Sequence, residues 1–320
     1  MSRVSVNQRA FKMVEKLIDN GDEYGVQVAR TENGATIIDA GVSAKGGYKA
    51  GEAITEICLG GCGRVYVSNG QYGDLFIPSV FVSTDEPAIA TLASQFAGWR
   101  IKVGDFSAMG SGPARALALE PRGLYDEVGY MDSSDRAVIV LETDQLPGAE
   151  VAAHIATKCH VSVDRVYAVV TPTSSLAGSV QIAGRVVETG LHKLHTLGLA
   201  PKAVLYGCGQ APVAPLHPKA ARAMGRTNDV ILYGGQTFYT VNHDDDEALG
   251  KIVERAPSSA SPDYGRPFYD IFKAANFDFY KVDAGLFAPA SLTVNNAKTG
   301  RVHRAGGINM DILRAMMGAE

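Results

Sequence analysis

The spacing of apolar and polar residues predicts short helices and strands along the whole chain. In "NQRAFKMVEKLIDNG" the apolar residues recur at helical spacing, and "GAEVAAHIATKCH" is typical of a helix rich in small residues. "YGVQVARTENGATIIDAG" alternates around Asn33-Gly34, which predicts a β-hairpin. The uninterrupted apolar run in "RAVIVLE" indicates a buried strand.

The middle of the chain is typical of an α/β protein. "PAIATLASQFAGWRIKVGDFSAMGSGPARALALE" predicts a helix, a short strand, a glycine-rich loop and a second helix. "DRVYAVVTP", a helix and "KAVLYG" follow in the order strand, helix, strand, which predicts a parallel crossover. "DVILYGGQTFYTV" predicts paired strands about Gly234-Gly235. The pattern therefore predicts the α/β class, with mixed α+β character.

The length favours two domains. A chain of 320 residues exceeds what one hydrophobic core usually serves. No linker or repeat marks a boundary, so we place one N-terminal α/β domain at about 1–150 and a second at about 151–320, with a discontinuous arrangement left open.

Composition and charge narrow the classes of partner. Hydrophobic residues make up 46% and charged residues 20%, the balance of an ordinary globular protein. The net charge is −4 with scattered basic residues, which argues against a nucleic-acid or polybasic membrane surface. The first residues lack a signal-peptide pattern and no run approaches the length of a membrane span, so we expect a cytoplasmic protein.

Two segments could hold a metal but favour simpler interpretations. "CLGGCG" places Cys58 and Cys62 in a glycine-rich turn, without the second cysteine pair that a zinc ribbon needs. The acidic residues of "HDDDEALGKIVERA" favour the N-terminus of a helix over a divalent-metal site.

Residues 174–198, "SSLAGSVQIAGRVVETGLHKLHTLG", carry the candidate chemistry. One apolar stripe predicts a single core-facing helix and comprises Leu176, Val180, Ala183, Val187, Leu191 and Leu194. A second stripe lies about 120° away and comprises Gln181, Arg185, Glu188, His192 and His195. The second stripe is either a solvated face with an ordinary ion pair or a functional one.

Two features favour a functional face. Glycine costs about 1 kcal/mol in a helix interior relative to alanine. Gly184 and Gly190 therefore indicate that a ligand or a neighbouring chain packs closely there. Arg185 precedes Glu188 by three residues, so the guanidinium can reach the carboxylate while both point into one space, a pair that suits a general base acting on water.

A zinc site is the alternative use of this stripe. His192 and His195 have the spacing His-x-x-His, and His217 or His243 could supply a third ligand. No cysteine or carboxylate in the pattern completes the set, which disfavours a metal.

Several long segments carry a resemblance to one family. They are "FSAMGSGPARALALEPRG", "TPTSSLAGSVQIAGRVVETGLHKLHTLG", "AMGRTNDVILYGG" and "PSSASPDYGRPFYDIFKAANFDFYKVD". Together they resemble methenyltetrahydromethanopterin cyclohydrolase over essentially the whole chain. The resemblance implies two α/β domains with a cleft between them, a cytoplasmic homotrimer, and no metal or organic cofactor. It also implies reversible hydrolysis of 5,10-methenyl-tetrahydromethanopterin to the 5-formyl compound, in the one-carbon metabolism of methanogenesis or of methylotrophic formaldehyde oxidation.

The resemblance also implies site residues. Arg185 and Glu188 match the pair that carries the chemistry in that family. The pterin substrate has an anionic tail, which makes the loop of Gly110, Ser111, Gly112 and Arg115 a candidate contact, although the glycines equally suit a tight turn. Gln181 and Tyr264 are further candidate contacts, and Phe268 is either a stacking residue or a core residue.

Two other functions stay open at this point. One is a non-catalytic tetrahydropterin-binding protein with the same fold. The other is a metal-dependent amidohydrolase.

Overall fold

The computed structural model describes residues 4–278 and 281–318, and its contacts divide the chain into two compact units. The first unit comprises Met1–Arg64 and Ala88–Gln181, and the second comprises Val65–Pro87 and Ile182–Glu320. Residues 65–87 thus group with the C-terminal part of the chain, and residues 151–181 group with the N-terminal part.

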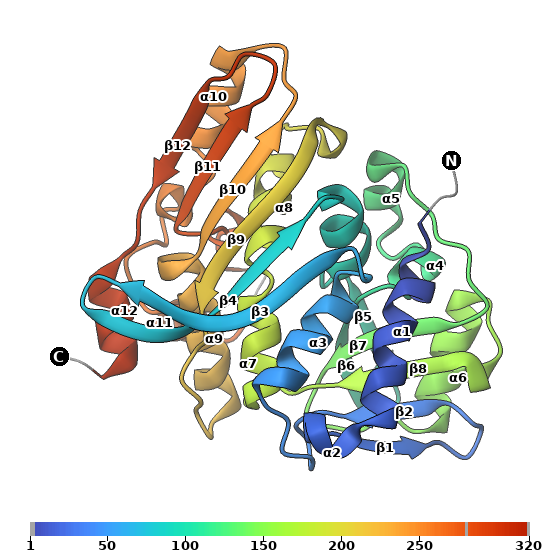
Figure 1. The fold of residues 1–320 in the computed structure, drawn as a ribbon. Helices are drawn as coiled ribbons and strands as arrows, with labels where there is room; N and C mark the ends of the chain where they lie inside the picture. The colour runs from blue at the N-terminus through green and yellow to red at the C-terminus, as the bar shows by residue number, and fades with distance from the viewer. Residues whose placement is uncertain (1–3, 279–280, 319–320) are drawn as a thin grey trace. The chain divides into compact units, whose positions relative to one another are not determined.

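The first unit is built on a six-stranded mixed sheet (Figure 1) with the strand order β1-β2-β8-β7-β6-β5. β2, β8 and β7 are parallel, and the remaining pairs are antiparallel. β7 and β8 are joined through helix α6, so the parallel crossover of this unit is β7–α6–β8. The hairpin predicted about Asn33-Gly34 is confirmed as the β1–β2 pair.

Helices cover both faces of this sheet because its central strands are apolar on both sides. Along β7, Val138 and Val140 belong to the core that α1 and α3 form, whereas Ile139 and Leu141 belong to the core that α6 forms. Parallel strands buried on both faces have such continuous apolar runs. The strands are β1 Gln27–Arg30, β2 Thr36–Asp39, β5 Trp99–Val103, β6 Phe106–Ser111, β7 Ala137–Glu142 and β8 Val166–Val170. The helices are α1 Val6–Asp19, α2 Gly21–Tyr24, α3 Tyr48–Cys58, η1 Ala88–Gln95, α4 Arg115–Ala118, α5 Arg122–Val128, α6 Ala149–Cys159, η2 Val163–Arg165 and α7 Leu176–Ala183.

The second unit is built on another six-stranded sheet, with the strand order β12-β11-β10-β9-β4-β3. β10 and β11 are parallel, and β9 pairs antiparallel with both β4 and β10. The strands are β3 Gly63–Tyr72, β4 Leu75–Thr84, β9 Val204–Pro212, β10 Gln236–Val241, β11 Ser291–Asn296 and β12 Val302–Gly306. The helices are α8 Val186–Thr196, η3 Pro201–Ala203, α9 Ala220–Gly234, α10 Asp246–Glu254, η4 Ser258–Ala260, α11 Phe268–Ala274, η6 Ala284–Leu286 and α12 Met310–Met317. Two mixed sheets with helices confirm the predicted α/β class.

Three local predictions are wrong. The glycine-rich loop predicted after the strand "WRIKV" is largely strand β6. A tight turn pairs residues 106–110 with β5. The crossover predicted between "DRVYAVVTP" and "KAVLYG" does not form, since β8 and β9 belong to different sheets. "DVILYGG" is the last part of helix α9 and not a strand.

Two other predictions are confirmed. Asp245 is the N-cap of α10, and its side chain accepts hydrogen bonds from the backbone N–H groups of Glu247 at 2.9 Å and Ala248 at 3.0 Å. Cys62 lies in the glycine-rich turn as predicted, whereas Cys58 is the last residue of α3, and both side chains are buried. Among the described helices, none combines the length and the apolar character that crossing a membrane requires.

Candidate functional site

The helix predicted over residues 174–198 is two helices. α7 ends at Ala183 and α8 begins at Val186, with Gly184 and Arg185 in the turn between them. Arg185 is the N-cap residue of α8, and Glu188 lies in the first turn of that helix. The break corrects the prediction of a single helix: the apolar stripe continues across a tighter turn, in which the N–H of Arg185 donates to the carbonyl of Ile182 at 2.9 Å.

Arg185 and Glu188 form a buried ion pair. Nη1 of Arg185 lies 3.8 Å from Oε2 of Glu188, and their side chains are only 9% and 8% exposed. The carbonyl of Arg185 accepts hydrogen bonds from the backbone N–H of Thr189 at 2.8 Å and from its hydroxyl at 2.9 Å. A carboxylate held beside a guanidinium and away from bulk water is suited to accept a proton from a bound water.

The close contact predicted at Gly190 is made by the protein itself. A Cβ atom on Gly190 would lie 2.3 Å from the hydroxyl oxygen of Tyr239, a residue of β10. This finding corrects the expectation that a ligand or a neighbouring chain packs there. Sequence reasoning missed Tyr239, and the helical glycine was the one signal that pointed to it.

Lys193 is a second residue that sequence reasoning missed. It is 9% exposed, and its Nζ donates a hydrogen bond to the carbonyl of Gly285 at 2.9 Å. Asp283 in the same segment accepts a hydrogen bond from the Ser261 hydroxyl at 2.6 Å. Lys193 therefore connects the last turns of α8 to residues 283–285, which follow Tyr264 in the sequence.

The histidines that follow the pair on α8 lie in half-buried positions. Burial lowers the pKa of His192, and the neighbouring His195 and Lys193 lower it further, so the neutral imidazole is favoured. His217 and His243 instead make local backbone hydrogen bonds. Within residues 4–278 and 281–318, no group of three or more side chains has the arrangement of a metal site.

Ser111 and Gln181 come together at Cys58. The Cys58 sulfur lies 3.6 Å from the Ser111 hydroxyl and 4.0 Å from Oε1 of Gln181. Gln181 is fully buried, and its amide nitrogen has no hydrogen-bond partner among the described residues. Gly110 and Ser111 end β6, and Gly112 follows with a φ of 92°, the left-handed region that favours glycine.

Arg115 donates to the carbonyl of Ser94, which also accepts a hydrogen bond from the backbone N–H of Gly112. Its side chain is fully buried, and its Nη1 donates to the carbonyls of Leu92 and Ser94, while Nε donates to the carbonyl of Glu120. These contacts favour a structural role for the guanidinium, and the substrate contact that the resemblance implies for Arg115 stays a prediction.

Tyr264 and Phe268 differ in how deeply they are buried. Tyr264 is half-buried, with its ring 5.1 Å from that of Tyr233 and its hydroxyl accepting from Nδ2 of Asn309 at 3.3 Å. Phe268 is fully buried and stacks on Phe272 at 5.7 Å. The core interpretation therefore holds for Phe268.

Comparisons with known proteins identify the family. The model of the cyclohydrolase (MCH) family matches residues 5–317. The chain belongs to this family. Among its relatives are proteins named methenyltetrahydromethanopterin cyclohydrolase from three archaea. The one from Methanothermobacter marburgensis is 49% identical, covering 98% of this chain and 99% of the relative. Those from Methanocaldococcus jannaschii and Methanosarcina mazei are 47% and 46% identical, each covering 98% of both chains.

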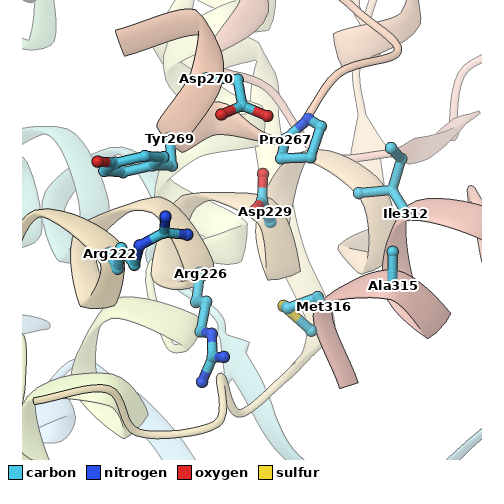
Figure 2. Close-up of a pocket in the computed structure, with 9 residues that line it drawn as sticks. All are labelled: Arg222, Arg226, Asp229, Pro267, Tyr269, Asp270, Ile312, Ala315 and Met316. Atoms are coloured by element: carbon cyan, nitrogen blue, oxygen red, sulfur yellow. The ribbon is translucent and has the colours of Figure 1, made fainter. Parts of the chain in front are cut away.

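A pocket of about 200 Å³ lies between α9, α11 and α12 (Figure 2). Its lining residues follow the Arg185–Glu188 pair in the sequence. Asp229 lies at its centre, 4% exposed, and accepts a hydrogen bond from the backbone N–H of Phe268 at 2.7 Å. The Arg226 guanidinium points away toward the carbonyls of Pro215 and Leu216. Asp229 therefore connects α9 to the start of α11.

We expect Asp229→Asn to remove a pH dependence of stability. Burial, assisted by the Asp270 carboxylate, raises the pKa of Asp229 from 3.8 to about 7. Between these values the unfolded state releases a proton that the folded state keeps, so the free energy of unfolding falls as pH rises. At about 1.4 kcal/mol per pKa unit, the loss between pH 4 and 7 approaches about 4 kcal/mol. Urea unfolding at pH 4 and pH 7 measures this loss, and a free energy of unfolding that falls equally in the wild type and in Asp229→Asn would contradict the assignment.

Proposed function

We propose that this cyclohydrolase hydrolyses 5,10-methenyl-tetrahydromethanopterin reversibly to 5-formyl-tetrahydromethanopterin. The observation that carries the proposal is the buried Arg185–Glu188 pair in the first turn of α8. Relatives that span the whole chain and are named for this reaction support it.

In the proposed mechanism Glu188 is the general base and then the general acid. The substrate carbon lies between two nitrogens and shares their positive charge, so it is already electrophilic. Glu188 takes one proton from water as the oxygen attacks this carbon, which gives a neutral tetrahedral intermediate. It then delivers that proton to the nitrogen at position 10 as the bond between carbon and that nitrogen breaks. The remaining hydroxyl proton leaves for solvent as the formyl C=O forms, so one proton is released overall.

Arg185 orients Glu188 and keeps it ionised in this mechanism. Its own charge near a cationic substrate is unfavourable unless a carboxylate compensates it. The 3.8 Å separation of Nη1 and Oε2 supplies that compensation. The chemistry needs no electron carrier, and we propose that neither a metal nor an organic cofactor takes part.

We propose that Gly110, Ser111, Gly112, Gln181 and Tyr264 contact the substrate. The meeting of Ser111 and Gln181 at Cys58 supports a shared role for two of them. The buried amide nitrogen of Gln181 is a donor that a ligand oxygen could accept from.

A spectroscopic hydrolysis assay tests the function. The absorbance of the methenyl group should disappear on adding protein to methenyl-tetrahydromethanopterin, and it should change more slowly with the folate analogue. Binding without loss of absorbance would point to a carrier protein. Loss of activity on adding a chelator, together with bound metal found by elemental analysis, would point to a metal-dependent amidohydrolase.

We further propose a cytoplasmic homotrimer, as the resemblance implies. Light scattering after size-exclusion chromatography should give about 101 kDa, three times the 33.8 kDa of one chain. A mass of one or two chains at micromolar concentration would contradict the trimer.

A further inference from the structure

Tyr239 connects β10 to the helix that carries the proposed catalytic pair. Its side chain is fully buried, and its hydroxyl donates a hydrogen bond to the carbonyl of Val187 at 2.7 Å. Val187 immediately precedes Glu188 in the first turn of α8. The hydroxyl therefore holds the backbone at the residue next to the proposed base.

Two glycines make room for this side chain. Gly190 of α8 faces the hydroxyl, and a Cβ there would lie 2.3 Å from the oxygen. Gly207 of β9 is the cross-strand partner of Tyr239, and a Cβ there would lie 3.3 Å from the ring. Glycine inside a helix costs about 1 kcal/mol relative to alanine. Gly190 therefore destabilises α8, but it leaves space for the tyrosine side chain.

The hydroxyl remains a donor at any working pH. Complete burial raises the pKa of Tyr239 far above its usual value, and the nearby Glu188 carboxylate raises it further. The hydroxyl donates to the carbonyl of Val187, and Glu188 is the next residue in the same turn of α8. The neutral phenol therefore holds the backbone next to the carboxylate and does not itself accept the proton that Glu188 takes up.

We propose that Tyr239 is a positioning residue for Glu188: by holding the Val187 carbonyl, its hydroxyl fixes the first turn of α8 and so directs the carboxylate toward Arg185 and the substrate. The inference rests on the proposed function and adds a residue to it. Tyr239 acts through α8 and does not itself touch the reacting atoms.

Tyr239→Phe is the first test, because it keeps the ring and removes the hydroxyl alone. We expect kcat to fall about five- to tenfold, the range for one lost neutral hydrogen bond, with KM within about twofold. An equal fall in kcat and kcat/KM marks an interaction made in the transition state. The acid limb of the pH profile of kcat/KM should also shift, because the surroundings of Glu188 change.

A pair of further variants separates positioning from packing. Gly190→Ala alone should lose stability, because its methyl group collides with the hydroxyl. In the double variant Gly190→Ala, Tyr239→Phe the 2.3 Å collision with the oxygen is removed, and the remaining tight contacts of that Cβ, with Pro289 and Cζ of residue 239, are at 3.2 Å. The melting temperature should recover in the double variant, whereas kcat should stay as low as in Tyr239→Phe.

Tyr72→Phe is the matched control. Tyr72 is a fully buried tyrosine of β3 whose hydroxyl accepts from Ser79 at 3.4 Å, and it belongs to a hydrophobic cluster that does not include Tyr239. Its variant should keep wild-type kcat. If folded Tyr239→Phe or the double variant keeps kcat within twofold of wild type while Glu188→Gln is inactive, the positioning role is overturned and the proposed function stands. If the wild-type protein itself does not hydrolyse the substrate, the proposed function fails first.

Discussion

Glu188→Gln should lower turnover of methenyl-tetrahydromethanopterin by at least about 10²-fold, since general acid–base catalysis typically contributes 10²–10⁴-fold. Glutamine has nearly the same shape as glutamate but cannot take a proton from water. The substitution also removes the carboxylate 3.8 Å from Arg185, so the positive charge beside a cationic substrate increases by one. We therefore expect KM to rise together with the fall in kcat.

Initial rates of absorbance loss across a range of substrate concentrations measure both effects. Glu254→Gln is the matched control, because Glu254 is an exposed glutamate at the end of α10. It should leave the rate unchanged. Circular dichroism and melting temperature should show that Glu188→Gln is folded. A folded variant with near-normal turnover would exclude Glu188 as the base.

The local pattern predicted most of the elements, because each depends on residues close in the sequence. The hairpin at Asn33-Gly34 and the buried strand over 137–142 follow from turn chemistry and apolar runs. Sheet membership could not be predicted this way. β8 and β9 have similar apolar patterns, yet they lie in different sheets, because the choice of partner depends on contacts across the whole unit.

The candidate site could be predicted only in part, because local spacing reveals contacts within one helix but not contacts between distant segments. The Arg185–Glu188 pair is an (i, i+3) relation within one helical turn, which spacing alone reveals. The break at Gly184 and Arg185 was hidden, because the apolar stripe continues across it. Tyr239 and Lys193 act on α8 through contacts with residues 52 and 92 positions away, and no local pattern encodes such distances.

Arg115→Met should lower stability strongly and leave the substrate affinity of the folded protein unchanged. The guanidinium donates to the carbonyls of Leu92 and Ser94 at 3.2 and 3.1 Å, at the C-terminal end of η1. The carbonyl end of a helix carries partial negative charge, so a cation there is favourable. The hydroxyl of Tyr125 completes this arrangement by donating to the carbonyl of Ala93 at 2.8 Å.

Methionine fills much of the same volume but donates no hydrogen bond, so the carbonyls lose their charged donor inside the protein. Each buried group left unsatisfied costs about 1–3 kcal/mol, and we expect a total loss of about 3–5 kcal/mol. At roughly 2–4 °C per kcal/mol, this loss corresponds to a fall in melting temperature of about 10 °C. Arg122→Met is the control, since Arg122 is a surface arginine whose side chain is 73% exposed, and its melting temperature should barely change. Should Arg115→Met instead melt like the wild type and bind methenyl-tetrahydromethanopterin much more weakly, the guanidinium would be a substrate contact after all.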